Sequence, residues 1–230
     1  MISQKPGRIK ALVFDFDGLI LETEGPIYQS WLELYQSYNL DIAMEKWVLN
    51  IGTAEETFDP LAELEALSGQ SVSPTRLENR WQREMELVMT QSTLPGVRDY
   101  LEDARQLGLK IALASSSSCN WVESHLERLR LIGYFDCIQA SDDVPITKPD
   151  PALYLTAVQR LEAQPFEAIA FEDSVNGILS AKQAGLYCVV VPNEMTRRLD
   201  TSLADIRLNS LADLPLSELI DRIELLAIRR

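Results

Sequence analysis

Short apolar runs rich in strand-forming residues recur along the chain and predict the strands of a buried sheet. The first run covers residues 11–16 and leads directly into acidic residues and a glycine, a pattern typical of a strand that ends in a functional loop. The later runs cover residues 110–114, 137–140, 168–171, 187–191 and, more weakly, 206–208.

Segments with helical periodicity separate these runs. They cover residues 97–107, 120–129, 151–161 and 174–184, and Gly108 and Gly185 follow the first and the last of them. Alternation of strand and helix implies right-handed crossovers, a parallel sheet covered on both faces, and functional groups gathered at the carboxyl ends of the strands. The pattern therefore predicts an α/β fold.

Residues 21–92 interrupt this alternation of strands and helices, because they show helical periodicity and no convincing strand. Apolar residues recur at helical spacing at positions 27, 31, 35 and 38 after Pro26, and again at positions 77, 81, 85 and 88 after Ser73 and Pro74. We predict an all-helical unit, inserted so that two stretches of chain cross to the sheet domain and can hinge.

Three of the four tryptophans, Trp31, Trp47 and Trp81, lie in this insertion. Aromatic residues at helical spacing usually belong to a core. We therefore expect these rings to pack inside a small helical bundle rather than to form a stacking site.

The charge of the chain limits the partners it can have. Its 230 residues are 46% hydrophobic and 24% charged, an ordinary globular composition, but the formal net charge is −14. Nucleic acid and anionic membranes would be repelled over most of the surface, so neither is an expected partner. An anionic small substrate would need a locally basic or metal-bearing pocket.

The cysteines and the lengths of the apolar runs indicate in which cellular compartment the protein is expected. Cys119, Cys137 and Cys188 are odd in number and far apart, which matches neither a disulfide framework nor a paired metal motif. Two aspartates interrupt the first apolar run, and no run approaches the ~20 residues of a membrane helix. We expect a soluble, cytoplasmic monomer.

Acidic residues follow two of the predicted strands. Asp15 and Asp17 flank Phe16, so an extended chain points both carboxylates to one side of the strand end, and Glu172 and Asp173 follow another strand. Taken alone, the first pair is equally compatible with loop acids or helix caps. In a parallel sheet, however, both pairs would share one crevice.

Other features of the same crevice also have structural explanations. Asp150 before Pro151 is a natural helix cap, and Ser174 is expected to cap the helix after it. Lys148 could be a solvated loop lysine, and the serines at 115–118 could form a capping turn. All of these features follow predicted parallel strands, and one shared site explains them better than four coincidences.

Together these motifs resemble those of the haloacid dehalogenase superfamily, in the subgroup of beta-phosphoglucomutase and related sugar-phosphate phosphatases. The first motif is the tetrapeptide 15–18, the second contains Ser115, the third contains Lys148, and the fourth is FEDSVNGI at 171–178. The resemblance covers nearly the whole chain. It implies a Rossmann-like three-layer core formed by residues 1–20 and 93–230, with the first strand central, and a helical cap formed by residues 21–92.

The resemblance also implies the roles of the first two acids. Asp15 corresponds to the nucleophile that attacks phosphorus and forms an aspartyl phosphate. Asp17 corresponds to the acid and base that protonates the leaving oxygen and then deprotonates the attacking water.

A dianionic phosphate beside these acids requires a hard cation, and oxygen ligands suit Mg²⁺. By resemblance, Asp15 and Asp173 bind the metal through carboxylates, Asp17 binds it through its backbone carbonyl, and Glu172 supports it. The residues that correspond to the phosphate-binding positions are Ser115, Ser116 and Lys148.

The sequence lacks the residues that other classes of phosphatase and phosphotransferase need. His125 is the only histidine and lies within a helical pattern, where it is expected to be a structural residue. No arginine stands six residues after any cysteine, as a cysteine phosphatase requires, and glycine-rich nucleotide motifs are absent from the sequence.

The insertion departs from the mutases of the subgroup. Their histidine on the linker into the cap corresponds to Ile27, and their cap-loop arginine corresponds to Glu55, which would repel a second phosphate. The sequence therefore favours a phosphatase acting on a small phosphorylated metabolite, with a hexose phosphomutase and a catalytically silent binding module as alternatives. Weaker candidates for substrate specificity are Gly52, Thr53, Glu55 and Glu56.

Overall fold

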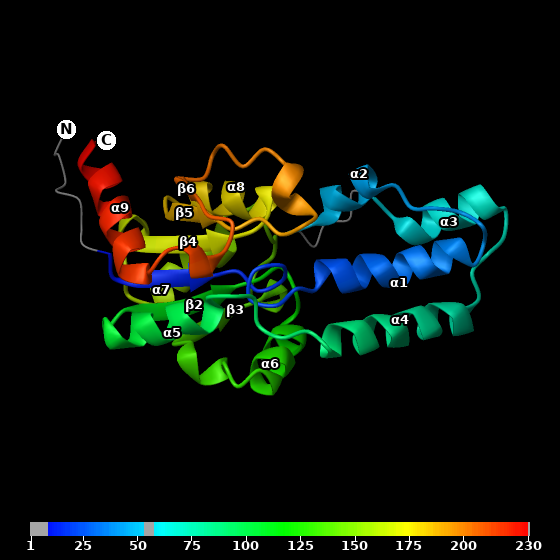
Figure 1. The fold of residues 1–230 in the computed structure, drawn as a ribbon, viewed down its shortest axis with the longest axis horizontal. Coiled ribbons are helices and arrows are strands. Elements are labelled where there is room, and N and C mark those ends of the chain that lie inside the picture. Colours follow the sequence, from blue (N-terminus) through cyan, green and yellow to red (C-terminus); the bar gives the residue numbers. More distant parts are fainter. Residues whose placement is uncertain (1–8, 53–57, 230) are drawn as a thin grey trace.

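A six-stranded parallel sheet forms the centre of the protein. The computed structural model describes residues 9–52 and 58–229. The strand order is β3-β2-β1-β4-β5-β6, so the first strand is central, as expected (Figure 1). The strands are β1 (Ala11–Phe14), β2 (Lys110–Ala114), β3 (Cys137–Gln139), β4 (Ala168–Glu172), β5 (Tyr187–Val190) and β6 (Ile206–Arg207).

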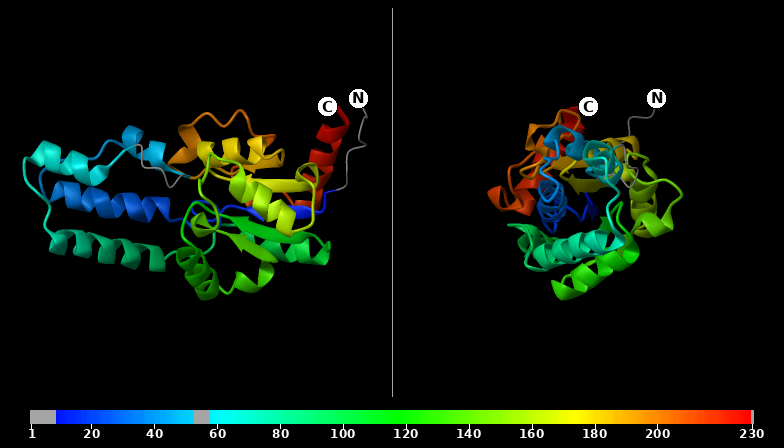
Figure 2. Two further views of the ribbon diagram at one scale, coloured as in Figure 1. Left: turned by 180° about the vertical axis from the view of Figure 1, so that it is seen from behind. Right: turned by 90° about the vertical axis from the view of Figure 1, so that its right-hand side faces the viewer.

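Helices cover both faces of the sheet, which completes the three layers of the predicted α/β fold. One face packs against α5 (Val97–Gln106), α6 (Cys119–Arg128) and α9 (Leu216–Arg229). The other packs against α7 (Ala152–Arg160) and α8 (Val175–Gln183) (Figure 2). Short 3-10 helices are η1 (Val48–Asn50), η2 (Ile132–Tyr134), η3 (Ser141–Asp143), η4 (Pro165–Glu167), η5 (Thr196–Arg198) and η6 (Leu211–Asp213).

In the described residues between β1 and α5, four α-helices extend the molecule beyond the carboxyl ends of the strands (Figure 1). They are α1 (Glu24–Gln36), α2 (Met44–Trp47), α3 (Pro60–Ser68) and α4 (Pro74–Met89). We call this part of the chain the helical insertion. As predicted, Pro74 is the first residue of α4, and the Ser73 hydroxyl accepts a hydrogen bond from the Arg76 amide at 3.4 Å.

The helical insertion has a hydrophobic cluster of its own, in which the tryptophans differ. Trp47 is buried beside Tyr35 and Leu64, and Trp31 is partly buried against the same cluster. Trp81 is 50% exposed, so the prediction of core packing is wrong for this ring. Helical periodicity identifies the inner face of α4, but here Trp81 borders an open cavity that residues of α1, α3 and α4 line.

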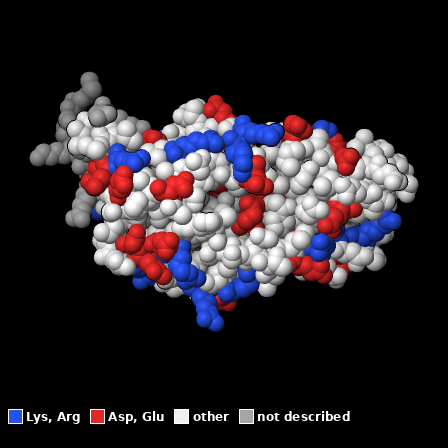
Figure 3. Space-filling view, in the orientation of Figure 1, with Lys and Arg blue, Asp and Glu red and all other residues white. Residues whose placement is uncertain are grey.

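The surface is mixed in charge. On the face shown in Figure 3, acidic and basic side chains are interspersed over both the sheet domain and the helical insertion. Within the described ranges, none of the helices is both long and apolar enough to cross a bilayer.

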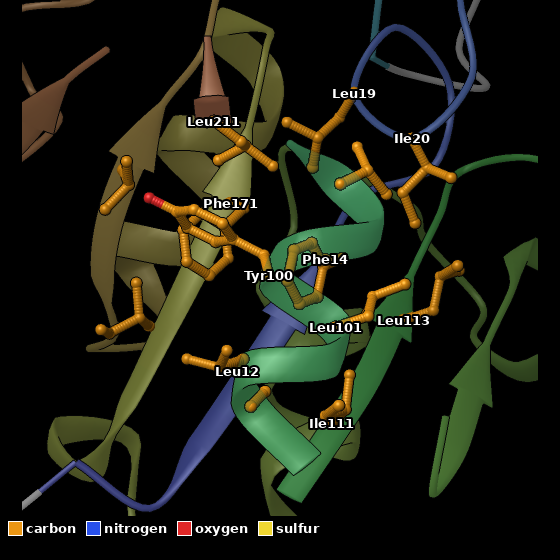
Figure 4. Close-up of a cluster of buried hydrophobic side chains, with 14 of the residues drawn as sticks. Leu12, Phe14, Leu19, Ile20, Tyr100, Leu101, Ile111, Leu113, Phe171 and Leu211 are labelled. Carbon is orange, nitrogen blue, oxygen red and sulfur yellow. The ribbon is translucent and has the colours of Figure 1, made fainter. Parts of the chain in front are cut away.

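Successive side chains of each strand point to opposite faces of the sheet, and one face carries large side chains while the other carries small ones. Leu12 and Phe14 point toward Tyr100 and Leu101 of α5, and Phe14 stacks on Phe171 of β4 at 4.7 Å between ring centroids (Figure 4). The opposite face carries mostly alanine and valine, against which α7 and α8 pack. Burying a side chain such as Phe14 contributes about 1.5–3 kcal/mol, which fixes the central strands and therefore the residues at their ends.

Candidate active site

The first acidic residue directly follows the central strand. The Asp15 amide still bonds to the Phe171 carbonyl at 3.0 Å, so the side chain leaves the sheet at its carboxyl edge, where it is 4% exposed. The chain then turns at Gly18, whose φ is +75°. A Cβ at Gly18 would lie 2.4 Å from an Asp173 carboxylate oxygen, so glycine lets the loops after β1 and β4 approach closely.

A buried lysine joins the two strand ends. Lys148 Nζ lies 2.6 Å from Asp15 Oδ1 and 2.6 Å from Glu172 Oε1, and the Tyr154 hydroxyl donates to the same Glu172 oxygen at 2.5 Å. Lys148 is 1% exposed, so it is not a solvated loop residue. Burial alone would lower the pKa of Lys148, but the carboxylates of Asp15 and Glu172 raise it above its ordinary value and keep the lysine charged.

A third carboxylate, that of Asp173, lies beside the two that Lys148 contacts. Oxygen atoms of Asp15, Glu172 and Asp173 lie within 4.8 Å of one another. Burial, reinforced by Glu172, raises the pKa of Asp15 to about 7, and burial together with Asp15 raises the pKa of Asp173 well above its ordinary value. Burial is the largest cause of both shifts, and the neighbouring carboxylates raise both pKa values further because Lys148 only partly offsets them.

The cluster fits a hard divalent cation. Asp173 Oδ2 accepts a hydrogen bond from Asn193 at 2.7 Å, whereas Asp173 Oδ1 is buried without a hydrogen-bond partner in the described part of the chain. Leaving a buried carboxylate oxygen unpaired is costly. When all three acids are ionised, they and Lys148 carry two net negative charges, which a divalent ion with a preference for oxygen ligands would balance.

The second acid of the tetrapeptide is held by neutral donors. Asp17 Oδ1 accepts from the Thr23 hydroxyl at 2.8 Å and from the Trp121 indole at 2.9 Å. Its Oδ2 accepts from the Ser117 hydroxyl at 2.6 Å and from Ser115 at 3.4 Å. Four donors therefore fix the orientation of this carboxylate.

Sequence reasoning missed several of these partners. Ser117 stands in the serine run that contains Ser115, and Asn193 follows the end of β5, so position alone could have suggested both. Trp121 and Tyr154 gave no such signal, because each is the third residue of a helix, where an aromatic side chain ordinarily indicates core packing.

Two of the three predicted phosphate-binding residues, Ser115 and Ser116, face a small cavity beside the acids, whereas Lys148 is not among the described residues that line it. Ser115, Ser116, Asp15 and Asp17 line a space of about 110 Å³. The helical insertion borders this cavity at Gly52, whose carbonyl accepts a hydrogen bond from the Ser116 hydroxyl at 3.3 Å. The other predicted specificity residues, at positions 53, 55 and 56, lie outside the described residues.

Residues of the helical insertion also line this cavity. Glu24, Ile27 and Asn50 contribute to its wall and border a second, larger cavity within the insertion. Burial and the neighbouring Asp17 raise the pKa of Glu24 to about 8.

The single histidine is structural, as predicted. His125 is 3% exposed and packs against Trp121, with ring centroids 4.4 Å apart, and against Phe16. It therefore supports the indole that holds Asp17.

A parallel α/β sheet with buried acids and a lysine at its carboxyl edge, and a helical insertion after the first strand, defines a class of hydrolases. The model of the haloacid dehalogenase-like hydrolase family matches residues 12–191. The chain belongs to this family, which confirms the resemblance found in the motifs.

Similar proteins include phosphatases. The Bacillus subtilis protein named "Putative phosphatase YhcW" is 43% identical over 216 residues, which cover 94% of this chain and 98% of that protein. Hexitol phosphatase B of Escherichia coli is 31% identical over 220 residues, covering 94% of this chain and 98% of the relative. The crystal structure of CbbY from Rhodobacter sphaeroides in complex with phosphate has a TM-score of 0.72 at 29% identity, covering 92% of this chain and 99% of that one.

Proposed function

We propose that the protein is a Mg²⁺-dependent phosphatase that hydrolyses a small phosphomonoester, a sugar phosphate, through an aspartyl phosphate on Asp15. The observation that carries the proposal is the position of Asp15: its carboxylate is held by Lys148 at the wall of a cavity that Asp17 also lines. A nucleophile and an acid/base group thus face one small space.

The reaction would take two displacements. An Asp15 carboxylate oxygen attacks phosphorus, the bond from phosphorus to the leaving oxygen breaks, and Asp17 gives that oxygen its proton. A water molecule then attacks phosphorus, the bond from phosphorus to the Asp15 oxygen breaks, and Asp17 takes up a proton of the water, which releases phosphate and restores the Asp15 carboxylate and the protonated Asp17. The donors from Thr23, Ser117 and Trp121 would hold Asp17 in the orientation that both steps need.

Positive charge would come from the protein and from the metal. Lys148, Ser115 and Ser116 would hold the phosphoryl oxygens. The ligands proposed for the cation are the carboxylates of Asp15 and Asp173 and the backbone carbonyl of Asp17, with Glu172 in support, and when bound the ion would neutralise charge on the transferred group.

The helical insertion would act as a cap. We propose that residues 21–92 form the cap and that residues 1–20 and 93–230 form the core domain. Support comes from Glu24 and Gly52, which reach from the insertion to the wall of the catalytic cavity. The cap would select the leaving group while the core handles the phosphoryl group.

Hydrolysis fits the site better than the alternatives do. Ile27 lines the cavity at the position where a mutase would carry a histidine, and an isoleucine can move no proton. The network around Lys148 is buried and costly to form, which argues against a silent binding module. The name of Hexitol phosphatase B and the phosphate bound to CbbY support a phosphorylated sugar or sugar alcohol as substrate. A monomeric state and a cytoplasmic location stay predictions.

The test is Asp15→Asn, which removes the nucleophile and preserves the shape of the side chain. Phosphate release from a panel of sugar phosphates with Mg²⁺ should fall at least about a thousandfold, as expected when a covalent step is lost. Asp221→Asn, the same change at an exposed position of α9, should keep wild-type rates. Circular dichroism should show both variants folded. Wild-type turnover by folded Asp15→Asn would refute the proposal.

A further inference from the structure

The catalytic cavity adjoins a much larger cavity of the helical insertion, and the two share part of their walls. The larger cavity has a volume of about 880 Å³ and shares Glu24, Ile27 and Asn50 with the catalytic cavity of about 110 Å³. The small cavity holds about four waters at ~30 Å³ each, which is room for a phosphoryl group and the atoms next to it. The large one lies at the upper end of the range for small-molecule pockets, about 300–1,000 Å³. The space therefore suits a leaving group much larger than the phosphoryl group.

One face of α1 connects the two spaces. Glu24, Ile27 and Trp31 stand three and four residues apart, so they lie on the same side of the helix, and all three line the large cavity. Trp31 is about 10 Å from Glu24 along the helix axis, at 1.5 Å per residue. A substrate that places its phosphate at Asp15 and reaches Trp31 must extend past a single sugar ring.

Aromatic rings surround the far part of the large cavity. Trp31 from α1, Trp47 from α2 and Trp81 from α4 all line it. Trp81 is 50% exposed although it faces this space, so an apolar surface is left uncovered next to the catalytic cavity. Indole rings offer flat apolar faces that suit the C–H faces of sugar rings.

The charges around the cavity favour a neutral leaving group. Glu24, Asp59 and Glu78 are acidic, and Arg80 is the one basic residue among the described lining residues. Arg80 forms an ion pair with Glu84, bonds to the Ser30 hydroxyl at 3.0 Å and lies over the Trp31 ring at 4.6 Å. Its charge is thus already compensated, and a second phosphate in this space would meet net repulsion.

We propose that the large cavity binds the neutral carbohydrate part of a substrate that has at least two sugar rings, so that the enzyme prefers the phosphate ester of a disaccharide to that of a single hexose. This inference rests on the proposed function and specifies its substrate. Trp31 and Trp81 would stack on the ring distal to the phosphate, while Glu24 and Glu78 would accept hydrogen bonds from sugar hydroxyls.

Hydrolysis of trehalose 6-phosphate and glucose 6-phosphate by the Mg²⁺-loaded enzyme tests the proposal. We expect kcat/KM to be at least about tenfold higher for the disaccharide ester. Trp81→Ala should lower that value about tenfold and leave the value for glucose 6-phosphate within about twofold. Met89→Ala, at a 52% exposed position of the same helix that does not line the cavity, is the matched control and should change neither value.

The outcomes separate this proposal from the proposed function. Equal efficiency with both esters, or a Trp81→Ala variant that affects both equally, would overturn the carbohydrate site and leave the phosphatase assignment intact. Preference for naphthyl phosphate over the disaccharide ester would also overturn it. If no ester is hydrolysed, the phosphatase assignment fails, but titration of Asp15→Asn with trehalose still tests the carbohydrate site. Saturable quenching of tryptophan fluorescence that is lost when Trp81→Ala is added supports the site. Absence of quenching refutes it.

Discussion

Two carboxylates that stand two residues apart lie in opposite surroundings. Asp15 is paired with a buried cation and crowded by other acids, whereas Asp17 is held by hydroxyl groups and an indole. The sequence could predict that both side chains leave the strand on one side, because that follows from alternation along an extended chain. It could not predict the indole of Trp121, because a contact between a helix and a loop depends on how the helix packs.

Glu24 offers a test of electrostatics at the level of one residue. Burial raises its pKa from 4.5 to about 8, with further contributions from Asp17, Glu22, Asp15 and Glu84. Between these two pH values the folded protein retains a proton that the unfolded chain releases, so the stability this group contributes is lost as the pH rises from about 4.5 to about 8. Glu24→Gln removes the titration. We expect the variant to be more stable than wild type at about pH 8, and this advantage to shrink toward pH 5.

Urea unfolding in EDTA at these two pH values measures the effect, with Glu127→Gln on the exposed surface of α6 as control. The control should track wild type at both pH values. A Glu24→Gln variant with the same pH dependence as wild type would show that this carboxyl is not buried among acids.

At the scale of elements, the helical insertion meets the core through a close backbone contact. Gly52 has a φ of +80°, and a Cβ there would lie 2.1 Å from the Ser174 hydroxyl, which caps α8 by accepting from the Gly177 amide at 3.0 Å. Asn176 adds a hydrogen bond to the Ile51 carbonyl at 3.0 Å. Position 52 was a weak candidate for specificity, and its geometry shows that it brings the insertion against the core.

Comparing Gly52→Ala with Gly69→Ala separates this contact from backbone strain. Both glycines have positive φ, +80° and +68°, so backbone strain alone should cost each variant about 1–2 kcal/mol of stability. Gly69 has no atom within 4 Å of an added Cβ, whereas Gly52 would collide with Ser174. We expect kcat/KM for a sugar phosphate to fall at least about tenfold in Gly52→Ala and to stay within about twofold in Gly69→Ala. Equal activity of the two variants would mean that the contact at Ser174 does not matter for catalysis.

The elements that the sequence predicted best are those of the sheet domain. Strands packed on both faces form continuous apolar runs, and capping residues such as Ser174 mark the starts of helices, so both signals are local. The final helix, α9, was missed, although Leu216, Leu219 and Ile223 repeat at helical spacing and are buried. Trp81 shows the limit of periodicity: it identifies a helix face, but whether packed side chains or a cavity lie opposite depends on distant elements.

At the scale of the whole molecule, the excess of negative charge indicates that the site needs a cation to bind a phosphate ester. A net charge of −14 repels a phosphate ester, and the three acids around Lys148 would add to this repulsion at the proposed binding place of the ester. Within that cluster, the orphaned oxygen of Asp173 is the feature a cation would satisfy most directly. Metal binding should therefore stabilise the fold as well as support catalysis.

Thermal unfolding with and without Mg²⁺ tests this coupling between metal and fold. At a Mg²⁺ concentration of about 100 times Kd, binding to the folded state adds about 2.7 kcal/mol, and about 2–4 °C per kcal/mol predicts a rise in Tm of roughly 5–10 °C. Asp173→Asn should lose this rise, yet in EDTA it should be at least as stable as wild type, because it removes a buried carboxylate whose pKa is raised by burial and by Asp15. Asp17→Asn makes the same chemical change at a residue proposed to bind the metal only through its backbone carbonyl, so it should lose turnover and keep the rise in Tm. If Mg²⁺ raised the Tm of Asp173→Asn as much as that of wild type, the cation would bind elsewhere.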